Sequence, residues 1–402
     1  MKILYVQRDY PAPDDYGRDY AEIAAGLAGL GHEVTVATPH RVVEGHEWRG
    51  TKVVDLPRDA RAVGMRAPAL LSNLAGGRSP AEAFDACFVH EWWNLGAHAM
   101  AHAATRAGLP VLYAPWASLN PWTIGRDARA LAKRALCRVL ARWYGALPPT
   151  LCLYDEVDAG YAADLGLRWP WTLGALPVYT YAPHHPSFDW QAALGRPVVG
   201  RRILFFNARL DIWQKGFDEL LQGVRLAARQ RGASFRTLLV LSGRAPNGPL
   251  ASDGPRAEAM ARPLCDEGLA VWKGFLSADD RIDMLAHCDM FVYPTRADGP
   301  PRPLREALWR GTPLMITPQS GLATWVRRHG AGIPIQAPDA ASIAQAVLRF
   351  DALPDDGITR LRDACRGLAE RLTTQRLAGD YAENLRAAIE NHRRAASRTK
   401  EA

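Results

Sequence analysis

The sequence contains no long apolar run. The apolar stretch at its N-terminus, MKILYVQRDYPAP, is too short for a signal peptide or a membrane span, and no later stretch approaches about twenty apolar residues. We therefore expect a cytoplasmic protein.

Two further absences narrow the chemistry. The six cysteines include no CxxC pair, which argues against a zinc site and a disulfide scaffold and favours buried free thiols. No GxGxxG motif follows the first expected strand, so a nicotinamide-dependent dehydrogenase is disfavoured.

The composition is that of a folded protein with an anionic partner. At 402 residues the chain is too long for one ordinary core, and 48% of its residues are apolar and 23% charged. The formal net charge of +7 favours a nucleotide, an anionic lipid surface or a nucleic acid as partner.

Strands and helices are expected to alternate from the N-terminus. A β-rich run over 1–7, a loop containing Gly17, a helix over 19–30 that Gly31 ends, and a strand over 34–37 form a βαβ unit. The alternation continues through a long helix over 126–144 and starts again near residue 202.

Two successive runs of this alternation predict two doubly wound, Rossmann-like α/β domains. We expect an N-terminal domain over 1–182, an irregular linker over 183–200 and a C-terminal domain over 201–375. A final helix over 376–402 should return toward the first domain and end in a basic tail. Ligands of such folds bind at the carboxyl ends of the strands, so the central cleft between the domains is the natural site.

An anion site is expected at the start of the second domain. A strand ends at Asn207, a loop presents Arg209 and Lys215, and Gly216 precedes a helix. Two cations beside a helix N-terminus can hold phosphate groups.

Two acidic residues enclose a proline-rich segment. Asp298 is expected in a loop after the strand DMFVYPT, and Glu306 in the first turn of the next helix. The prolines between them are tolerated because the first helical N–H groups have no internal partner. Both carboxylates should face the space beyond the strand, where each can accept hydrogen bonds from sugar hydroxyls.

These motifs resemble glycosyltransferase family 4, which has the GT-B fold of two Rossmann-like domains facing a central cleft. The resemblance is carried by Arg209, Lys215, the acidic-x7-Glu motif that ends at Glu306, and a Gly-x-Pro step from Gly311 to Pro313. It continues through SGLATWVRRHGAGIPI and covers most of the second domain. In the first domain, GLGHEVTVAT and FVHEWW are similar more loosely.

The resemblance implies a retaining, hexosyltransferase-type enzyme that uses a nucleotide-diphosphate sugar. Arg209 and Lys215 would hold the diphosphate, Glu306 the ribose and Asp298 the donor sugar. The remaining implied roles belong to His90 beside the reacting centre, Gly17 at the phosphates, Lys273, Gly274 and Phe275 near the base, and Gly299 and Arg302 at the sugar.

Fixed cations can stabilise a departing phosphate without a metal, and no strand-ending DxD motif of metal-dependent transferases is present. We therefore expect neither a metal nor another cofactor.

One departure from the family pattern stands out. Where the family usually has Gly-Phe-Gly, Gly299 is followed by Pro300 and Pro301, which have no N–H to donate to sugar hydroxyls. This predicts an unusual donor sugar, such as a deoxygenated one, or a sugar contacted by Arg302 instead, or else a decayed site.

A basic helix in the first domain is a candidate acceptor surface. Its cations are Arg126, Arg129, Lys133, Arg134 and Arg138, while Leu136, Val139, Leu140 and Trp143 should share one apolar face. A surface helix with a solvated face explains this pattern, and so does peripheral contact with the inner face of a membrane near a lipid-linked or other glycan acceptor of polysaccharide synthesis.

Other functions stay open at this point. A catalytically decayed nucleotide-sugar or membrane-surface binding protein fits the two prolines. Within the same fold, a sugar-nucleotide epimerase or a phosphorylase is an alternative. A nucleic-acid binder would fit only the charge, since no motif for one is present, and we expect no nucleic acid as partner.

Overall fold

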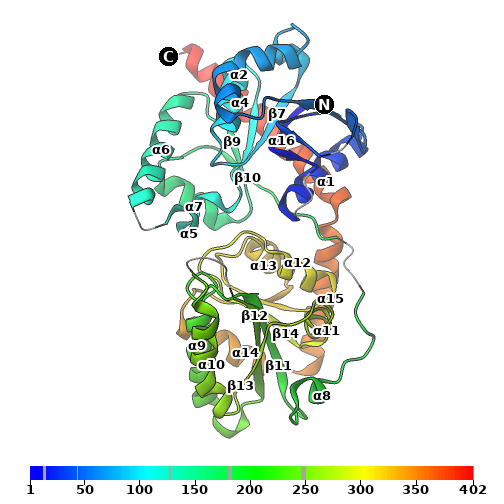
Figure 1. Ribbon diagram of the computed structural model, residues 1–402, viewed down its shortest axis with the longest axis vertical. Helices are drawn as coiled ribbons and strands as arrows, with labels where there is room; N and C mark the ends of the chain where they lie inside the picture. The colour runs from blue at the N-terminus through cyan, green and yellow to red at the C-terminus, as the bar shows by residue number, and fades with distance from the viewer. Residues whose placement is uncertain (12–14, 43, 126–127, 180–182, 246–249, 402) are drawn as a thin grey trace. The chain divides into compact units, whose positions relative to one another are not determined.

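The computed structural model describes residues 1–11, 15–42, 44–125, 128–179, 183–245 and 250–401. The chain divides into two compact units (Figure 1). Unit 1 comprises Met1–Pro177 and Leu372–Ala402, and unit 2 comprises Val178–Arg371.

Unit 1 is built on a sheet whose described strands follow the order β10-β9-β8-β7-β1-β3-β6-β5. These strands are β1 (Lys2–Val6), β3 (Glu33–Thr38), β5 (Glu47–Trp48), β6 (Thr51–Asp55), β7 (Ala86–His90), β8 (Val111–Ala114), β9 (Thr150–Leu153) and β10 (Trp171–Leu173). All pairs are parallel except β5 with β6. A second small sheet pairs β2 (Asp9–Tyr10) with β4 (His40–Arg41).

The helices of unit 1 pack around this sheet. They are α1 (Asp15–Gly29), α2 (Ala60–Leu74), α3 (Pro80–Ala83), α4 (Leu95–Arg106), η1 (Trp116–Leu119), α5 (Pro121–Ile124), α6 (Ala128–Tyr144), α7 (Glu156–Asp164) and α16 (Thr374–Glu401). Helix α2 packs against α4, and α16 against α1 (Figure 1).

Unit 2 has a parallel sheet with the order β13-β12-β11-β14-β15-β16. Its elements are α8 (Trp190–Leu194), β11 (Arg202–Arg209), α9 (Phe217–Arg231), η2 (Gly232–Ser234), β12 (Thr237–Arg244), α10 (Asp253–Asp266), β13 (Ala270–Gly274), α11 (Ala278–His287), β14 (Met290–Tyr293), α12 (Arg302–Trp309), β15 (Leu314–Ile316), α13 (Ala323–His329), β16 (Gly332–Pro334), α14 (Ala340–Asp351) and α15 (Asp355–Arg371).

Both sheets have near-continuous apolar strands, because helices cover a parallel sheet on both faces. Ile3, Leu4 and Tyr5 of β1 are fully buried, as are Leu204 and Phe205 of β11. Two doubly wound α/β units, predicted from the alternation of elements, are confirmed.

Two local expectations are wrong. Helix α1 begins at Asp15, so Gly17 lies in its first turn rather than in a loop, and the Gly17 carbonyl accepts a hydrogen bond from Gln7 Nε2 at 3.0 Å. The segment expected to be irregular over 183–200 contains α8, which Asp189 caps by accepting from two backbone N–H groups. One carboxylate at the N-cap is enough to start so short a helix.

Candidate functional site

The strand order places the first cluster at the switch point of unit 2. The chain runs outward from β11 to β12 and β13 on one side and to β14, β15 and β16 on the other. Residues that follow β11 and β14 therefore meet at the carboxyl edge, where doubly wound sheets bind ligands. Arg209 ends β11, and Asp298 follows β14.

A glycine lets the two loops approach at this point. Gly216 caps α9 with φ of 63°, in the left-handed region that favours glycine. A Cβ atom on it would stand 2.0 Å from the carbonyl oxygen of Pro294, which no side chain could tolerate. Gly216 therefore brings the Lys215 backbone directly against the end of β14.

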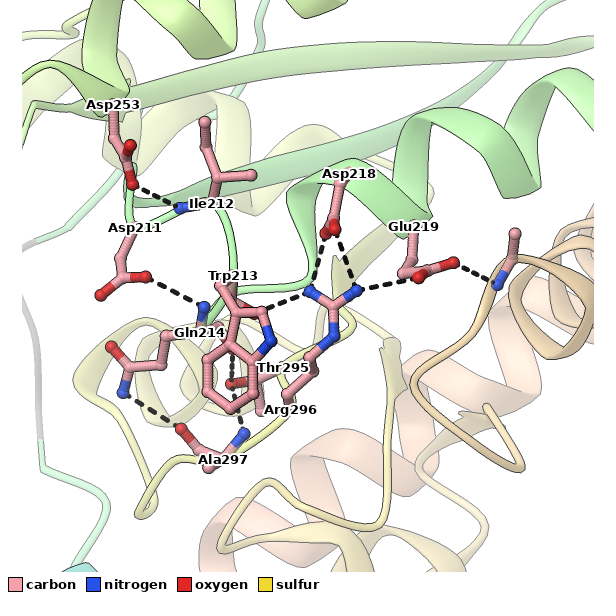
Figure 2. Close-up of polar contacts among 11 residues, drawn as sticks. Asp211, Ile212, Trp213, Gln214, Asp218, Glu219, Asp253, Thr295, Arg296 and Ala297 are labelled. Carbon is pink, nitrogen blue, oxygen red and sulfur yellow. Dashed lines mark hydrogen bonds and ion pairs between the residues drawn. The ribbon is translucent and has the colours of Figure 1, made fainter. Parts of the chain in front are cut away.

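Arg296 ties these loops to the start of α9 (Figure 2). Its guanidinium donates to both carboxylate oxygens of Asp218, at 2.7 and 3.0 Å, and to Glu219 at 2.9 Å. It also donates to the Trp213 carbonyl at 2.8 Å, and its backbone N–H donates to the Gln214 carbonyl at 2.9 Å. The fork of Arg296 thus fixes both loops in one geometry.

Gln214 connects the same loops from their other side (Figure 2). Its Nε2 donates to the Ala297 carbonyl at 3.1 Å. Its Oε1 accepts from Arg209 at 2.8 Å. Thr295 donates to the Gln214 carbonyl at 2.8 Å. Arg209 is therefore held by a neutral partner, with its charge uncompensated by this bond.

Lys215 and Asp298 form an ion pair. The ammonium is 6% exposed and bonds to Asp298 Oδ2, which also accepts from the Tyr293 hydroxyl at 2.8 Å. Asp298 Oδ1 accepts from the Gly299 N–H at 3.0 Å. The two residues that the sequence singled out on separate motifs are thus brought together, with the carboxylate fully hydrogen-bonded.

Glu306 lies deeper than the sequence indicated. Helix α12 begins at Arg302, inside the proline-rich segment, so Glu306 belongs to its second turn and not its first. The cause is Pro301, which is the extended N-cap of the helix. The carboxylate is 1% exposed and pairs with Arg281, whose second nitrogen lies 3.4 Å away, and with Arg302 at 2.8 Å.

The segment around the two prolines is fixed against the loop after β15. Asp298 N–H donates to the Gln319 carbonyl at 3.0 Å, and Gly321 N–H donates to the Gly299 carbonyl at 3.2 Å. A Cβ on Gly321 would lie 2.6 Å from the Pro300 nitrogen, so the two loops touch backbone to backbone. The prolines therefore shape a closely packed turn without offering any N–H.

The candidate base site lies on the same sheet edge, two strands away from β11. Lys273 donates to the Ala193 carbonyl of α8 at 2.7 Å, and Gly274 ends β13 with φ of 63°. The Phe275 ring is 74% exposed, so it presents an aromatic face to solvent.

In unit 1, His90 ends β7 beside β1, the switch point of that sheet. The residue is 1% exposed, and neither ring nitrogen has a hydrogen-bond partner among the described residues. Tyr5, Tyr20 and Phe88 surround it, with ring centroids 4.7, 4.3 and 4.3 Å away. Burial lowers the pKa of His90 well below its usual value, so the imidazole is neutral.

The buried face of helix α6 differs from the apolar face that the sequence predicted. Its buried stripe contains Cys137, Leu140 and Tyr144, whereas Val139 is 57% and Trp143 44% exposed. The predicted apolar face is therefore wrong for Val139 and Trp143. Tyr144 lies in the aromatic core, at 5.1 Å from Trp169 between ring centroids, so the buried face of the helix includes it instead of Trp143.

The cations of α6 differ from one another in their surroundings. Lys133 donates to the Thr123 carbonyl and lies 5.5 Å from the Trp93 ring centroid. Arg129, Arg134 and Arg138 are exposed. Arg126 lies outside the described residues.

The prediction of free, mostly buried cysteine thiols is confirmed. All six cysteines are free, and all but Cys265 are fully buried. Within the described residues, no three His, Cys, Asp or Glu side chains cluster as metal ligands. None of the described helices is long and apolar enough to cross a membrane.

Sequence reasoning missed Gln214, Arg281 and Arg296. Arg281 is 25 residues from Glu306 in the chain, and Arg296 is 78 from Asp218. Which of these side chains meet depends on how the strands and helices pack, and the sequence does not show this. The position of Arg296, two residues before Asp298, was a usable signal.

Comparisons with known proteins agree with this arrangement. The model of the glycosyl transferases group 1 matches residues 201–351, and that of the glycosyl transferase 4-like domain matches residues 16–168. No curated protein matches the sequence.

Solved structures share the fold at low identity. HepE of Anabaena in complex with UDP has a TM-score of 0.63 and 16% identity over 96% of this chain and 100% of that chain. Sucrose-phosphate synthase from Thermosynechococcus elongatus has a TM-score of 0.57 and 15% identity over 97% of this chain and 99% of that chain. A glycosyltransferase from Rickettsia africae has a TM-score of 0.59 and 13% identity, covering 98% of each chain.

These likenesses show the GT-B fold. Together with the two family matches, which lie one in each unit, they establish that the chain belongs to the family 4 type of GT-B glycosyltransferases.

Proposed function

We propose that the protein is a retaining, metal-independent transferase that moves a hexose from a nucleotide-diphosphate sugar to a glycan or lipid-linked acceptor of polysaccharide synthesis. The observation that carries this proposal is the cluster at the switch point of unit 2. There Arg209 and Lys215 stand at the carboxyl edge beside Asp298, in the segment matched by the group 1 model. HepE of Anabaena, a structural neighbour, has been solved with UDP-glucose, which supports a nucleotide sugar as donor.

The cations suit the charge that develops in this reaction. As the sugar–phosphate bond breaks, negative charge builds on the departing diphosphate, and preorganised cations stabilise it without reorganisation. Arg209 bonds to the neutral amide of Gln214, and Lys215 is fixed by Asp298 and by the loop that Arg296 holds. We assign the diphosphate to Arg209 and Lys215.

The remaining donor contacts follow from their places on the edge. Glu306 would accept from ribose hydroxyls while Arg281 and Arg302 hold it, and Asp298 and Gly299 would face the sugar. Lys273, Gly274 and the exposed Phe275 would lie beside the base. For Gly17 and His90, which belong to unit 1, the roles implied by the resemblance stay proposals.

Helix α6 is proposed to rest on an anionic lipid surface at the inner face of a membrane. Arg134 and Arg138 alternate on its exposed side with Leu131, which is 72% exposed, and Val139. Cations around exposed apolar side chains are typical of helices that lie in a lipid interface. Sedimentation with phosphatidylglycerol vesicles at low salt should co-pellet the protein, and phosphatidylcholine vesicles should not.

Calorimetric titration with UDP, GDP, ADP and dTDP tests the donor assignment. One nucleotide should bind, and Arg209→Ala and Glu306→Ala should each weaken it about 10-fold or more, as loss of a charge-assisted contact does. Arg229→Ala, an exposed arginine of α9 in the same unit, is the matched control. Binding of none of the four would contradict the proposal.

A decayed binding protein is the second candidate, favoured by Pro300 and Pro301, which offer no N–H to a sugar. The two candidates differ in turnover. A nucleotide that binds while its hexose sugars are neither transferred nor slowly hydrolysed would favour the decayed site.

A further inference from the structure

A segment near the start of unit 2 contacts helix α11 and carries two adjacent histidines. Residues 183–190 read PHHPSFDW, and Pro186 favours an extended backbone at His185, the residue before it. We call residues 184–190 the connector. All of its contacts described below lie within unit 2.

His185 holds a carboxylate of α11 with two bonds. Its backbone N–H donates to Asp283 Oδ1 at 2.9 Å, and its ring Nδ1 lies 2.6 Å from Asp283 Oδ2. The Asp283 side chain is 10% exposed, whereas that of His185 is 74% exposed. The carboxylate therefore lies under the connector, and the imidazole can exchange protons with solvent.

Two aromatic rings fasten the connector one turn further along α11. The Phe188 ring stacks on the His287 ring with centroids 5.7 Å apart, and Trp190 Nε1 donates to the His287 carbonyl at 3.2 Å. The His184 ring meets the same His287 ring edge to face, at 5.4 Å. Because Asp283 and His287 are one turn apart, the connector covers the last turn of the helix.

His185 faces two carboxylates of α11. These are Asp283, which bonds to its ring, and Asp279, one turn earlier on the helix. The hydrogen bond to Asp283 and the charge of that carboxylate raise the pKa of His185. The charged pair therefore contributes fully below the ordinary histidine pKa of about 6.5 and is lost as the pH rises through the raised value. In alkaline solution only a neutral hydrogen bond is left.

His184 faces mainly positive charge. Partial burial lowers the pKa of His184, and so do His287 of α11, Arg310 at the end of α12 and the adjacent His185, while Asp283 opposes them. The docked connector therefore favours the neutral His184 ring. This contribution is complete above about pH 6.5 and is lost as the pH falls through the lowered pKa.

The helix under the connector also holds a buried residue of the carboxyl edge. Arg281 lies two residues before Asp283 on α11 and bonds to Glu306. Arg310, which faces His184, donates to the Glu306 carbonyl at 3.1 Å. Whatever fastens the connector on α11 therefore restrains the helix that positions Glu306.

We propose that the connector is a pH-sensitive clasp, which holds the chain on α11 most firmly in a narrow pH range and loosens in more acidic and in more alkaline solution. Because His185 contributes fully below about pH 6.5 and His184 above it, both contributions are complete together only near that pH. When fastened, the clasp steadies the last turn of α11. It does not rest on the proposed function, since all of its groups belong to unit 2 and act without a ligand.

Hydrogen exchange of the full chain without nucleotide, from about pH 5 to about pH 8, tests this proposal. The reporters are peptides covering 184–190, which include the bonded His185 N–H, and 278–287 of α11. Their protection, corrected for intrinsic exchange and divided by that of α9, should be highest near pH 6.5 and fall at least about 2-fold on each side.

Three variants assign the two sides of the profile. His185→Gln keeps a neutral donor that does not titrate, so the loss of protection above about pH 6.5 should disappear. His184→Gln should abolish the loss below that pH for the same reason. His329→Gln, an exposed histidine of α13 in the same unit, is the matched control and should keep both sides.

A flat profile in the parent chain would overturn the proposal, as would a profile that both connector variants leave unchanged or that His329→Gln flattens equally. If the connector peptide follows the profile and 278–287 does not, the clasp does not steady α11, and that part is wrong. The nucleotide titration on the same samples is independent. A peaked profile without nucleotide binding keeps the clasp and contradicts the transferase proposal, and a flat profile with nucleotide binding does the reverse.

Discussion

The two units place polar groups at equivalent sheet edges but satisfy them differently. In unit 2 the buried carboxylates of Asp298 and Glu306 are matched by Lys215, Arg281 and Arg302. In unit 1 the buried nitrogens of His90 have no partner among the described residues. The contrast indicates that the edge of unit 2 is a preorganised array of charges, whereas His90 in unit 1 is held by packing against aromatic rings.

Lys215→Met should produce the largest effect, because it breaks the matched array. It removes a cation assigned to the departing phosphate and leaves Asp298 with only Tyr293 and Gly299 as donors. We expect kcat/KM to fall at least about 100-fold, and the free energy of unfolding by about 1–3 kcal/mol. Steady-state kinetics and urea unfolding measure the two effects.

Retained activity in Lys215→Met would show that the pair is structural. Arg229→Met, on the exposed side of α9, should change neither quantity.

Glu306→Gln tests the second matched carboxylate. The amide keeps the shape but removes the negative charge that Arg281 and Arg302 both contact, at a Glu306 side chain that is 1% exposed. The nucleotide Kd should rise about 10-fold, and stability should fall by about 2 kcal/mol. If the nucleotide Kd is unchanged and only stability falls, Glu306 is a structural partner of the arginines and no ribose ligand.

Arg296→Lys probes how the array is positioned. An ammonium cannot reproduce the fork that reaches Asp218, Glu219 and the Trp213 carbonyl together. The loop that carries Lys215 should loosen, raising the donor KM about 5-fold with a smaller change in kcat. A fall in kcat with no change in KM would show that Arg296 acts elsewhere.

His90→Phe should give the smallest change in stability, and it sharpens the contrast from the side of unit 1. Phenylalanine keeps the aromatic contacts to Tyr5, Tyr20 and Phe88 and removes the two unsatisfied nitrogens. We expect the free energy of unfolding to rise by about 1 kcal/mol while transfer is lost. Destabilisation together with full activity would mean that His90 belongs to the fold and not to the site.

The sequence predicted the alternation of strands and helices, because buried parallel strands and glycine-ended helices leave strong local patterns. The sequence assigned Arg209, Lys215 and Asp298 to one donor site only through the family resemblance. In the structure they lie in one region because residues after neighbouring parallel strands share an edge. The roles of these residues in donor binding stay predictions.

Local sequence patterns could not predict which distant segments contact one another. The partners of Glu306 depend on how α11 packs beside α12, which no spacing reveals. The buried face of α6 depends on tertiary packing in the same way: Cys137, Leu140 and Tyr144 face the core, and Val139 and Trp143 face solvent. The early start of α12 within its prolines was a local feature, but the alternative of a longer loop fitted the same residues.

The last helix has a consequence for synthesis of the chain. Unit 2 is contiguous, from Val178 to Arg371, whereas unit 1 needs α16, whose Tyr381 donates to the Ala175 carbonyl at 3.0 Å and whose Leu385 is fully buried. The N-terminal part of unit 1 is synthesised before unit 2 but cannot complete its core until α16 has been made. The order of completion is therefore reversed: the second unit can finish folding first, and a fragment that stops at Arg371 would keep the donor edge while losing a wall of the first unit.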